Sequence, residues 1–165
     1  MRKSVTFLAC MALAASAAAA RSAIIYADGA WAAIDRGATC EALSRSVRIA
    51  PKGKLQAIAG FTFSGDRQRW GEFHARLRRM PRSGAAVMLR IGDQPFLLVS
   101  RGNWAWSDGP LQEQAMIAAL RSASGMIVES RDSAGRRVVD PYSLEGAATA
   151  IDAAAAACAG KSLAP

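Results

Sequence analysis

The chain has 165 residues, of which 52% belong to the hydrophobic set, and this length fits one globular domain better than two. Lysine and arginine number 21 against 13 aspartate and glutamate residues, so the formal net charge is +8 and the composition is compatible with an anionic partner. The chain has one histidine, His74, which excludes a multi-histidine metal site and a two-histidine acid–base pair.

Residues 1–20 have the organisation of a secretory signal peptide. Two basic residues near the start precede an apolar run from Val5 to Ala15, and small residues precede a cleavage site near Ala20. A membrane anchor and a lipoprotein acylated at Cys10 are the competing interpretations, but the stretch is rich in alanine and too weakly apolar to span a bilayer well. We therefore predict export to the periplasm or beyond, with residues 21–165 forming a single β-rich domain.

Most of the exported chain is predicted to form antiparallel strands. Apolar residues alternate over 55–63, and the Gly-Asp pair at 92–93 joins two apolar runs as a hairpin. Residues 69–80 fit a strand or a helix face, and we favour a strand because Gly71 lies within the segment. The predicted strands are a first strand pair within 23–47, then 55–63, 69–80, 85–91, 94–100, 104–106, 126–129 and 136–140.

Two helices complete the prediction. Pro110 favours a helix start, and residues 111–123 contain good helix formers. Ser143 is a suitable N-cap for a second helix over 144–159. The fold class predicted is mainly β, an antiparallel β-sandwich-like single domain with one inserted short helix and a C-terminal helix.

Export leaves two cysteines, Cys40 and Cys158. An oxidising compartment favours a disulfide between them, and the predicted C-terminal helix places Cys158 on its buried face. The alternative is a pair of buried free thiols. The disulfide would join the beginning of the domain to its end.

We predict no catalytic, cofactor-binding or metal site. The predicted strand places His74 on the face opposite Phe73, where it would be exposed and without a role. Neither a Gly-x-Ser-x-Gly motif nor a Gly-rich phosphate-binding loop occurs in the sequence. The rival hypothesis is a small envelope hydrolase that uses His74 with Asp66 or Glu72.

Arginines concentrate after the strand at 55–63. Guanidinium groups suit carboxylates and phosphates, so lipopolysaccharide, phospholipid, peptidoglycan or an acidic protein are the expected partners, with peripheral membrane contact included and nucleic acid excluded by export. The alternative is a coding bias, since arginine outnumbers lysine 17 to 4 over the whole chain. The candidate surface for an anionic ligand comprises Arg67, Arg69, Arg76, Arg78, Arg79 and Arg82.

Trp104 and Trp106 stand two residues apart on a predicted strand and would therefore share one face. An aromatic platform for a sugar or peptide is one interpretation. We favour the other, in which both indoles pack into the core.

The second half of the chain has a distinctive order of elements. A helix ending at 118–123 precedes Gly125–Val128, a polar hairpin at Gly135 and the segment Tyr142–Ala147. This order resembles the C-terminal half of the invasion-associated locus B family of exported alphaproteobacterial proteins. Ala147 stands where the family usually has phenylalanine.

The start of the domain carries a looser similarity to the same family, in which a tryptophan strand precedes a cysteine, as Trp31 precedes Cys40 here. A further central cysteine pair, common in the family, is missing from this sequence. The resemblance implies a mainly β, sandwich-like periplasmic domain associated with host interaction or envelope function, and it brings no catalytic residues.

These features together predict a non-enzymatic exported binding or accessory protein of the cell envelope. The alternatives are the hydrolase that uses His74 and a purely structural envelope component.

Overall fold

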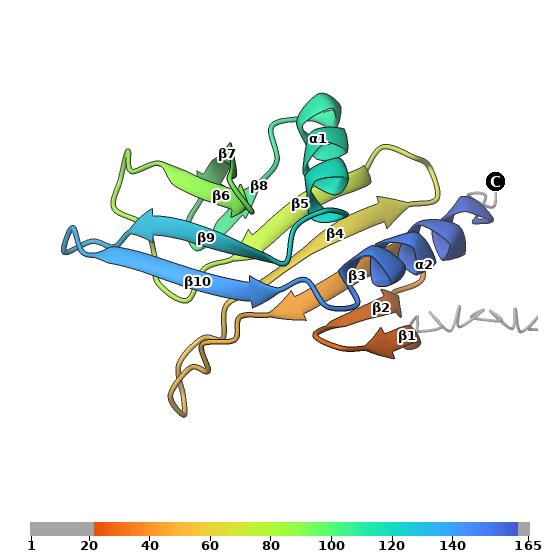
Figure 1. The fold of residues 1–165 in the computed structure, drawn as a ribbon, viewed down its shortest axis with the longest axis horizontal. Helices are drawn as coiled ribbons and strands as arrows, with labels where there is room; N and C mark the ends of the chain where they lie inside the picture. The colour runs from red at the N-terminus through yellow and green to blue at the C-terminus, as the bar shows by residue number, and fades with distance from the viewer. Residues whose placement is uncertain (1–21, 162–165) are drawn as a thin grey trace, which may run out of the picture.

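The computed structural model describes residues 22–161, and the predicted signal peptide of residues 1–20 lies outside the described residues. Ten strands and two helices follow one another within this range (Figure 1). Their bounds are β1 Ala23–Asp28, β2 Trp31–Asp35, β3 Thr39–Arg45, β4 Ile58–Ser64, β5 Trp70–Arg76, β6 Val87–Ile91, β7 Gln94–Arg101, β8 Trp104–Trp106, α1 Pro110–Leu120, β9 Gly125–Arg131, β10 Arg137–Ser143 and α2 Ala147–Ala159.

The described strands form one antiparallel sheet in the order β1-β2-β3-β4-β5-β8-β7-β6-β9-β10, and this sheet is not closed. The mainly β class and the two helices are thus confirmed, whereas a sandwich-like fold had suggested two separate sheets. The three-residue strand β8 is the physical reason for the difference. Its Ala105 pairs with Ala75 of β5 on one side and with Ser100 of β7 on the other, which joins the two halves.

The sheet curls so that its last strand returns toward the end of β3. The carbonyl oxygen of Pro141 in β10 accepts hydrogen bonds from the Val47 amide at 2.9 Å and from the Ser46 hydroxyl at 3.0 Å. These bonds bring the segment between β3 and β4 against β10, although Ser46 and Pro141 lie 95 residues apart in sequence.

Residues 23–45 form three strands where we expected a pair. The chain turns at Gly29 and again at Gly37. Each turn connects two strands, so β1, β2 and β3 form a meander at the edge of the sheet.

The segment that fitted both a strand and a helix is strand β5, and a β-bulge explains the ambiguity. Thr62 pairs with Glu72 but Phe63 pairs with Trp70, so Gly71 is the extra residue, with φ +92°. A bulge shifts the alternation by one residue. Trp70 and Phe73 therefore both meet phenylalanines of β4, a three-residue spacing that imitates a helix.

The two helices lie against the sheet on its core side. Helix α2 packs on β1 to β4, and its alanines at 147, 150 and 154 are fully buried, which permits a close approach. It begins after Gly146 and not at the predicted Ser143, because Ser143 still pairs with Gly125 as the last residue of β10. Gly146 has φ +80°, and a Cβ there would lie 2.4 Å from the Asp28 carbonyl oxygen.

The predicted disulfide between Cys40 and Cys158 is confirmed. It joins β3 to α2, both cysteines are fully buried, and their Cα atoms lie 5.8 Å apart. It therefore fixes the C-terminal helix to the sheet.

Candidate functional sites

The six arginines of the predicted surface lie at two ends of β5. Arg67 and Arg69 belong to the turn between β4 and β5, while Arg78, Arg79 and Arg82 follow β5. Arg76, the last residue of β5, is half-buried and donates to the Gln56 carbonyl oxygen at 3.4 Å. A strand of seven residues spans about 23 Å, so these arginines contribute to separate sites.

Arg78 and Arg79 are held by carboxylates of the opposite part of the sheet. The Arg78 guanidinium pairs with Asp140, which is 1% exposed, and Arg79 Nη1 lies 3.4 Å from Asp132 Oδ2. Burial raises the pKa of Asp140, although the adjacent Arg78 acts in the opposite direction. Both guanidinium groups are therefore fixed in position and partly neutralised.

A basic groove of about 560 Å³ lies between these arginines and the β3–β4 loop, which comprises residues 46–57. No acidic side chain of the described chain lines it. Its lining residues are Arg48, Ile49, Ala50, Pro51, Lys54, Leu55, Arg78 and Arg79.

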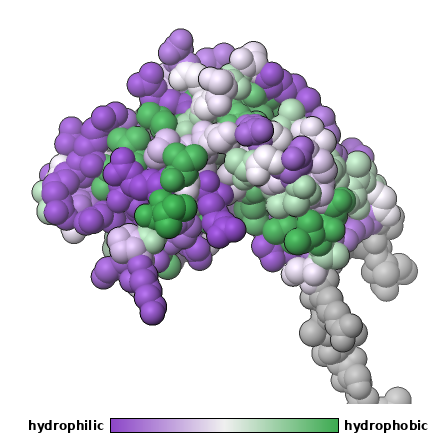
Figure 2. All heavy atoms as spheres, turned by 60° about the horizontal axis from the view of Figure 1, so that its bottom comes forward, coloured by the Kyte–Doolittle hydropathy of each residue, from purple (hydrophilic) through white to green (hydrophobic). Residues whose placement is uncertain are grey.

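The β3–β4 loop exposes apolar side chains beside its cations. Ile49 is 79% exposed, Val47 59% and Leu55 48%. The loop projects from the body of the sheet in Figure 1, and Figure 2, which turns that side forward, shows hydrophobic groups between hydrophilic ones there. Apolar groups exposed among cations are typical of a surface that contacts another protein or a membrane.

The base of this loop is ordered by one side chain. Gln56 Oε1 accepts from the Ala50 amide at 2.8 Å, and Gln56 Nε2 donates to the carbonyl oxygens of Ser46 at 3.1 Å and Arg48 at 3.2 Å. Arg48 and Ile49 are thus presented from a defined backbone.

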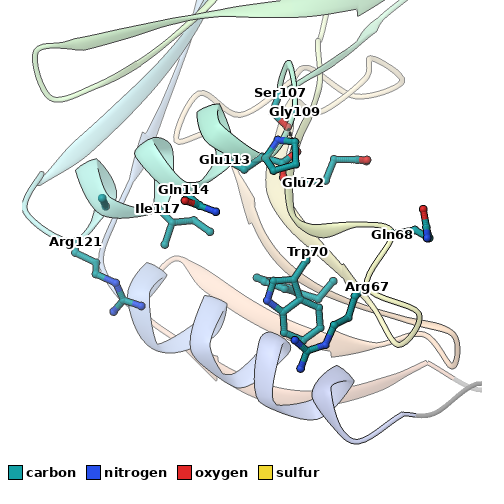
Figure 3. A pocket seen from close by; sticks show the side chains of 13 residues that line it. Arg67, Gln68, Trp70, Glu72, Ser107, Gly109, Glu113, Gln114, Ile117 and Arg121 are labelled. Atoms are coloured by element: carbon teal, nitrogen blue, oxygen red, sulfur yellow. Dashed lines mark hydrogen bonds between the residues drawn. The ribbon is translucent and has the colours of Figure 1, made fainter.

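A larger hollow of about 740 Å³, the hairpin–helix cavity, lies between the β4–β5 turn and α1 (Figure 3). Arg67 carries its guanidinium 4.7 Å from the centre of the Trp70 ring, and Trp70 meets Phe63 edge-on at 5.4 Å. The polar residues that line it are Arg67, Gln68, Glu72, Ser107, Glu113, Gln114 and Arg121.

Sequence reasoning missed this cavity as a site, because Glu72 was considered only as a partner of His74 and Glu113 not at all. Glu113 lies on the buried side of α1, three residues after Pro110, and accepts from the Ser107 hydroxyl at 2.8 Å. A carboxylate among the buried positions of a predicted helix was the available signal.

His74 is buried, which corrects the expectation of an exposed side chain. It is 7% exposed, its Nδ1 lies 3.1 Å from Thr62 Oγ1, and its ring centre is 6.1 Å from that of Trp104. The cause is β8, which pairs with β5 and brings both indoles next to His74. Burial lowers the pKa of His74.

Trp104 and Trp106 are half-buried beside this histidine, while Ala105 between them is fully buried in the core. The indoles stack with ring centres 6.3 Å apart. They share a shallow hollow of about 230 Å³ with His74, Glu41 and Glu72, so their expected place in the core is wrong.

The groups of the rival hydrolase hypothesis are only partly brought together. Glu72 lines the same hollow as His74, but the Asp66 carboxylate accepts from the Ser64 hydroxyl and the Gln68 amide within its own turn. Residues 22–161 contain no group of three or more histidine, cysteine or acidic residues that could hold a metal ion.

Fold and sites together define a disulfide-linked, mainly β domain with a basic groove and a cavity lined by both signs of charge. Neither helix of the described part is long and apolar enough to cross a membrane. Comparisons with protein families, curated proteins and solved structures found no match to this chain.

Proposed function

We propose that this protein is a non-enzymatic, exported binding protein of the cell envelope that docks on an anionic phospholipid surface through its β3–β4 loop. The observation that carries the proposal is the basic groove. Arg48 and Lys54 line it together with Arg78 and Arg79, and no carboxylate of the described chain does.

Export is part of this proposal. It is supported by the signal-like organisation of residues 1–20 and by the Cys40–Cys158 disulfide, a bond that persists in oxidising compartments. The proposed relation to the invasion-associated locus B family, as a remote branch, would make the curled sheet a sandwich-like scaffold and link the docking to host interaction.

The electrostatic part of docking comes from the loop cations. A basic residue near an anionic membrane contributes about 1 kcal/mol to the binding free energy. At about 0.1 M salt the attraction falls off over about 10 Å, and added salt shortens this distance. Arg48, Lys52 and Lys54 lie on the loop, and none of them forms an ion pair within residues 22–161. Their charges are therefore available to lipid phosphates.

The apolar part comes from Val47, Ile49 and Leu55 on the same loop. Their exposed side chains would leave water at the boundary between head groups and acyl chains. Neither the electrostatic nor the apolar contribution binds strongly alone, and stable peripheral anchoring needs both.

Co-sedimentation with phosphatidylglycerol-containing vesicles tests this proposal. Arg48→Ser combined with Lys54→Ser should weaken binding roughly 10- to 30-fold, the effect of losing two surface cations. The matched control is Arg90→Ser combined with Arg101→Ser, which removes two exposed arginines outside the groove. Equal weakening by both pairs, or equal binding to phosphatidylcholine vesicles, would refute docking through the groove.

The hydrolase that uses His74 is less well supported. The imidazole is buried and hydrogen-bonded to Thr62, whereas a general base needs access to its substrate.

A further inference from the structure

The hairpin–helix cavity is a second site, independent of the basic groove. The β-bulge at Gly71 places Trp70 on the cavity side, and Ile117 of α1 approaches so closely that a Cβ on Gly71 would lie 2.9 Å from its Cδ1. The volume of the hairpin–helix cavity, about 740 Å³, lies within the usual range of small-molecule sites.

One part of the cavity is acidic. Glu113 is 7% exposed and its hydrogen bond comes from a neutral hydroxyl, that of Ser107. Glu72 is half-buried, and within residues 22–161 neither carboxylate forms an ion pair. Both carboxylates line the cavity without a cation at ion-pair distance in the described chain, so this part favours a ligand that brings a positive charge.

The other part is basic. Figure 3 shows Arg67 and Arg121 away from Glu72 and Glu113, with Trp70 and Ile117 between the two parts. Arg121 is engaged by Asp152 at 2.6 Å, which leaves Arg67 as the guanidinium for a ligand.

Arg67 is held there against a backbone preference. It is the one non-glycine residue of the described chain with a positive φ, 59°, and its side chain stacks on Trp70. Strained residues of this kind concentrate at ligand-binding sites.

We propose that this cavity binds a short peptide with free termini. The peptide ammonium faces Glu72 and Glu113, the terminal carboxylate faces Arg67, and an apolar side chain lies on Trp70 and Ile117. A ligand with both charges satisfies both parts of the cavity, which an anion or a cation alone does not.

Isothermal titration with the peptide Ala-Leu-Ala tests the proposal, with the N-acetylated and C-amidated forms as probes of each end. The free peptide should bind, and each blocked form should bind about tenfold more weakly or worse, because it loses a charged hydrogen bond. Equal binding of the three forms, or no binding of the free peptide, would overturn the proposal.

Variants locate the site. Arg67→Gly keeps the backbone conformation and removes the guanidinium, so it should fold normally and lose the preference for a free carboxylate. Glu113→Gln should lose the preference for a free ammonium, and Arg90→Ser, an exposed arginine outside the cavity, should change neither preference. Unchanged preferences in both cavity variants would overturn the assignment. The groove variant, Arg48→Ser with Lys54→Ser, should bind the free peptide as the wild type does, so a failure of this proposal can be told apart from a failure of vesicle docking.

Discussion

His74 lies on the face of β5 where Trp104, from the neighbouring strand β8, packs against it, and its burial couples stability to pH. The buried ring resists protonation, so the folded protein binds the proton at a lower pH than the unfolded chain, whose histidine has a pKa of about 6.5. Between the folded pKa and the unfolded pKa, the unfolded state binds more protons than the folded state does. The contribution of His74 to stability is therefore present in full above about pH 6.5 and is lost as pH falls toward the lower, folded pKa.

We expect the free energy of unfolding of the wild type to fall between about pH 7.5 and about pH 5.5 more steeply than that of His74→Gln. Glu41 raises the histidine pKa and Arg69 and Arg36 lower it, but burial is the largest effect. The raised pKa of Glu72 acts in the opposite sense and is present in both proteins. Urea denaturation across this pH range checks the prediction, and parallel pH profiles would contradict it.

The disulfide acts at the scale of elements, because it fixes α2 on β3. Replacing both Cys40 and Cys158 by alanine should lower the free energy of unfolding by about 2–4 kcal/mol, since the oxidised bond restricts a long loop in the unfolded chain. Denaturation with urea measures this loss. Reductant should destabilise the wild type by a similar amount and leave the double variant unchanged, and a double variant as stable as the oxidised wild type would refute the stabilising role.

Individual strands were easier to predict from the sequence than the way in which distant strands pair. Alternation identified β4, and the Gly-Asp pair identified the β6–β7 hairpin, because both signals are local. The bulge at Gly71 and the double pairing of β8 depend on contacts between distant strands, so periodicity in one segment does not reveal them. The burial of His74 follows from β8 and could not be predicted without it.

The basic groove depends on the curl of the whole molecule. Arg78 and Arg79 were predicted as part of an anionic-ligand surface, but Arg48 and Lys54 come from another part of the sequence. The bonds of Ser46 and Val47 to Pro141 bring that loop against β10, whose Asp140 holds Arg78. The arginines predicted as one surface therefore lie in separate places, and the groove combines cations from two distant segments of the sequence.

The central claim is that the β3–β4 loop meets the lipid surface, and hydrogen–deuterium exchange on phosphatidylglycerol-containing vesicles tests it most directly. We predict slower amide exchange over residues 46–57 when vesicles are present, with the exchange of β1 and α1 unchanged and the effect abolished by high salt. Slower exchange confined to other elements, or no change at the loop while the protein co-sediments, would contradict the account.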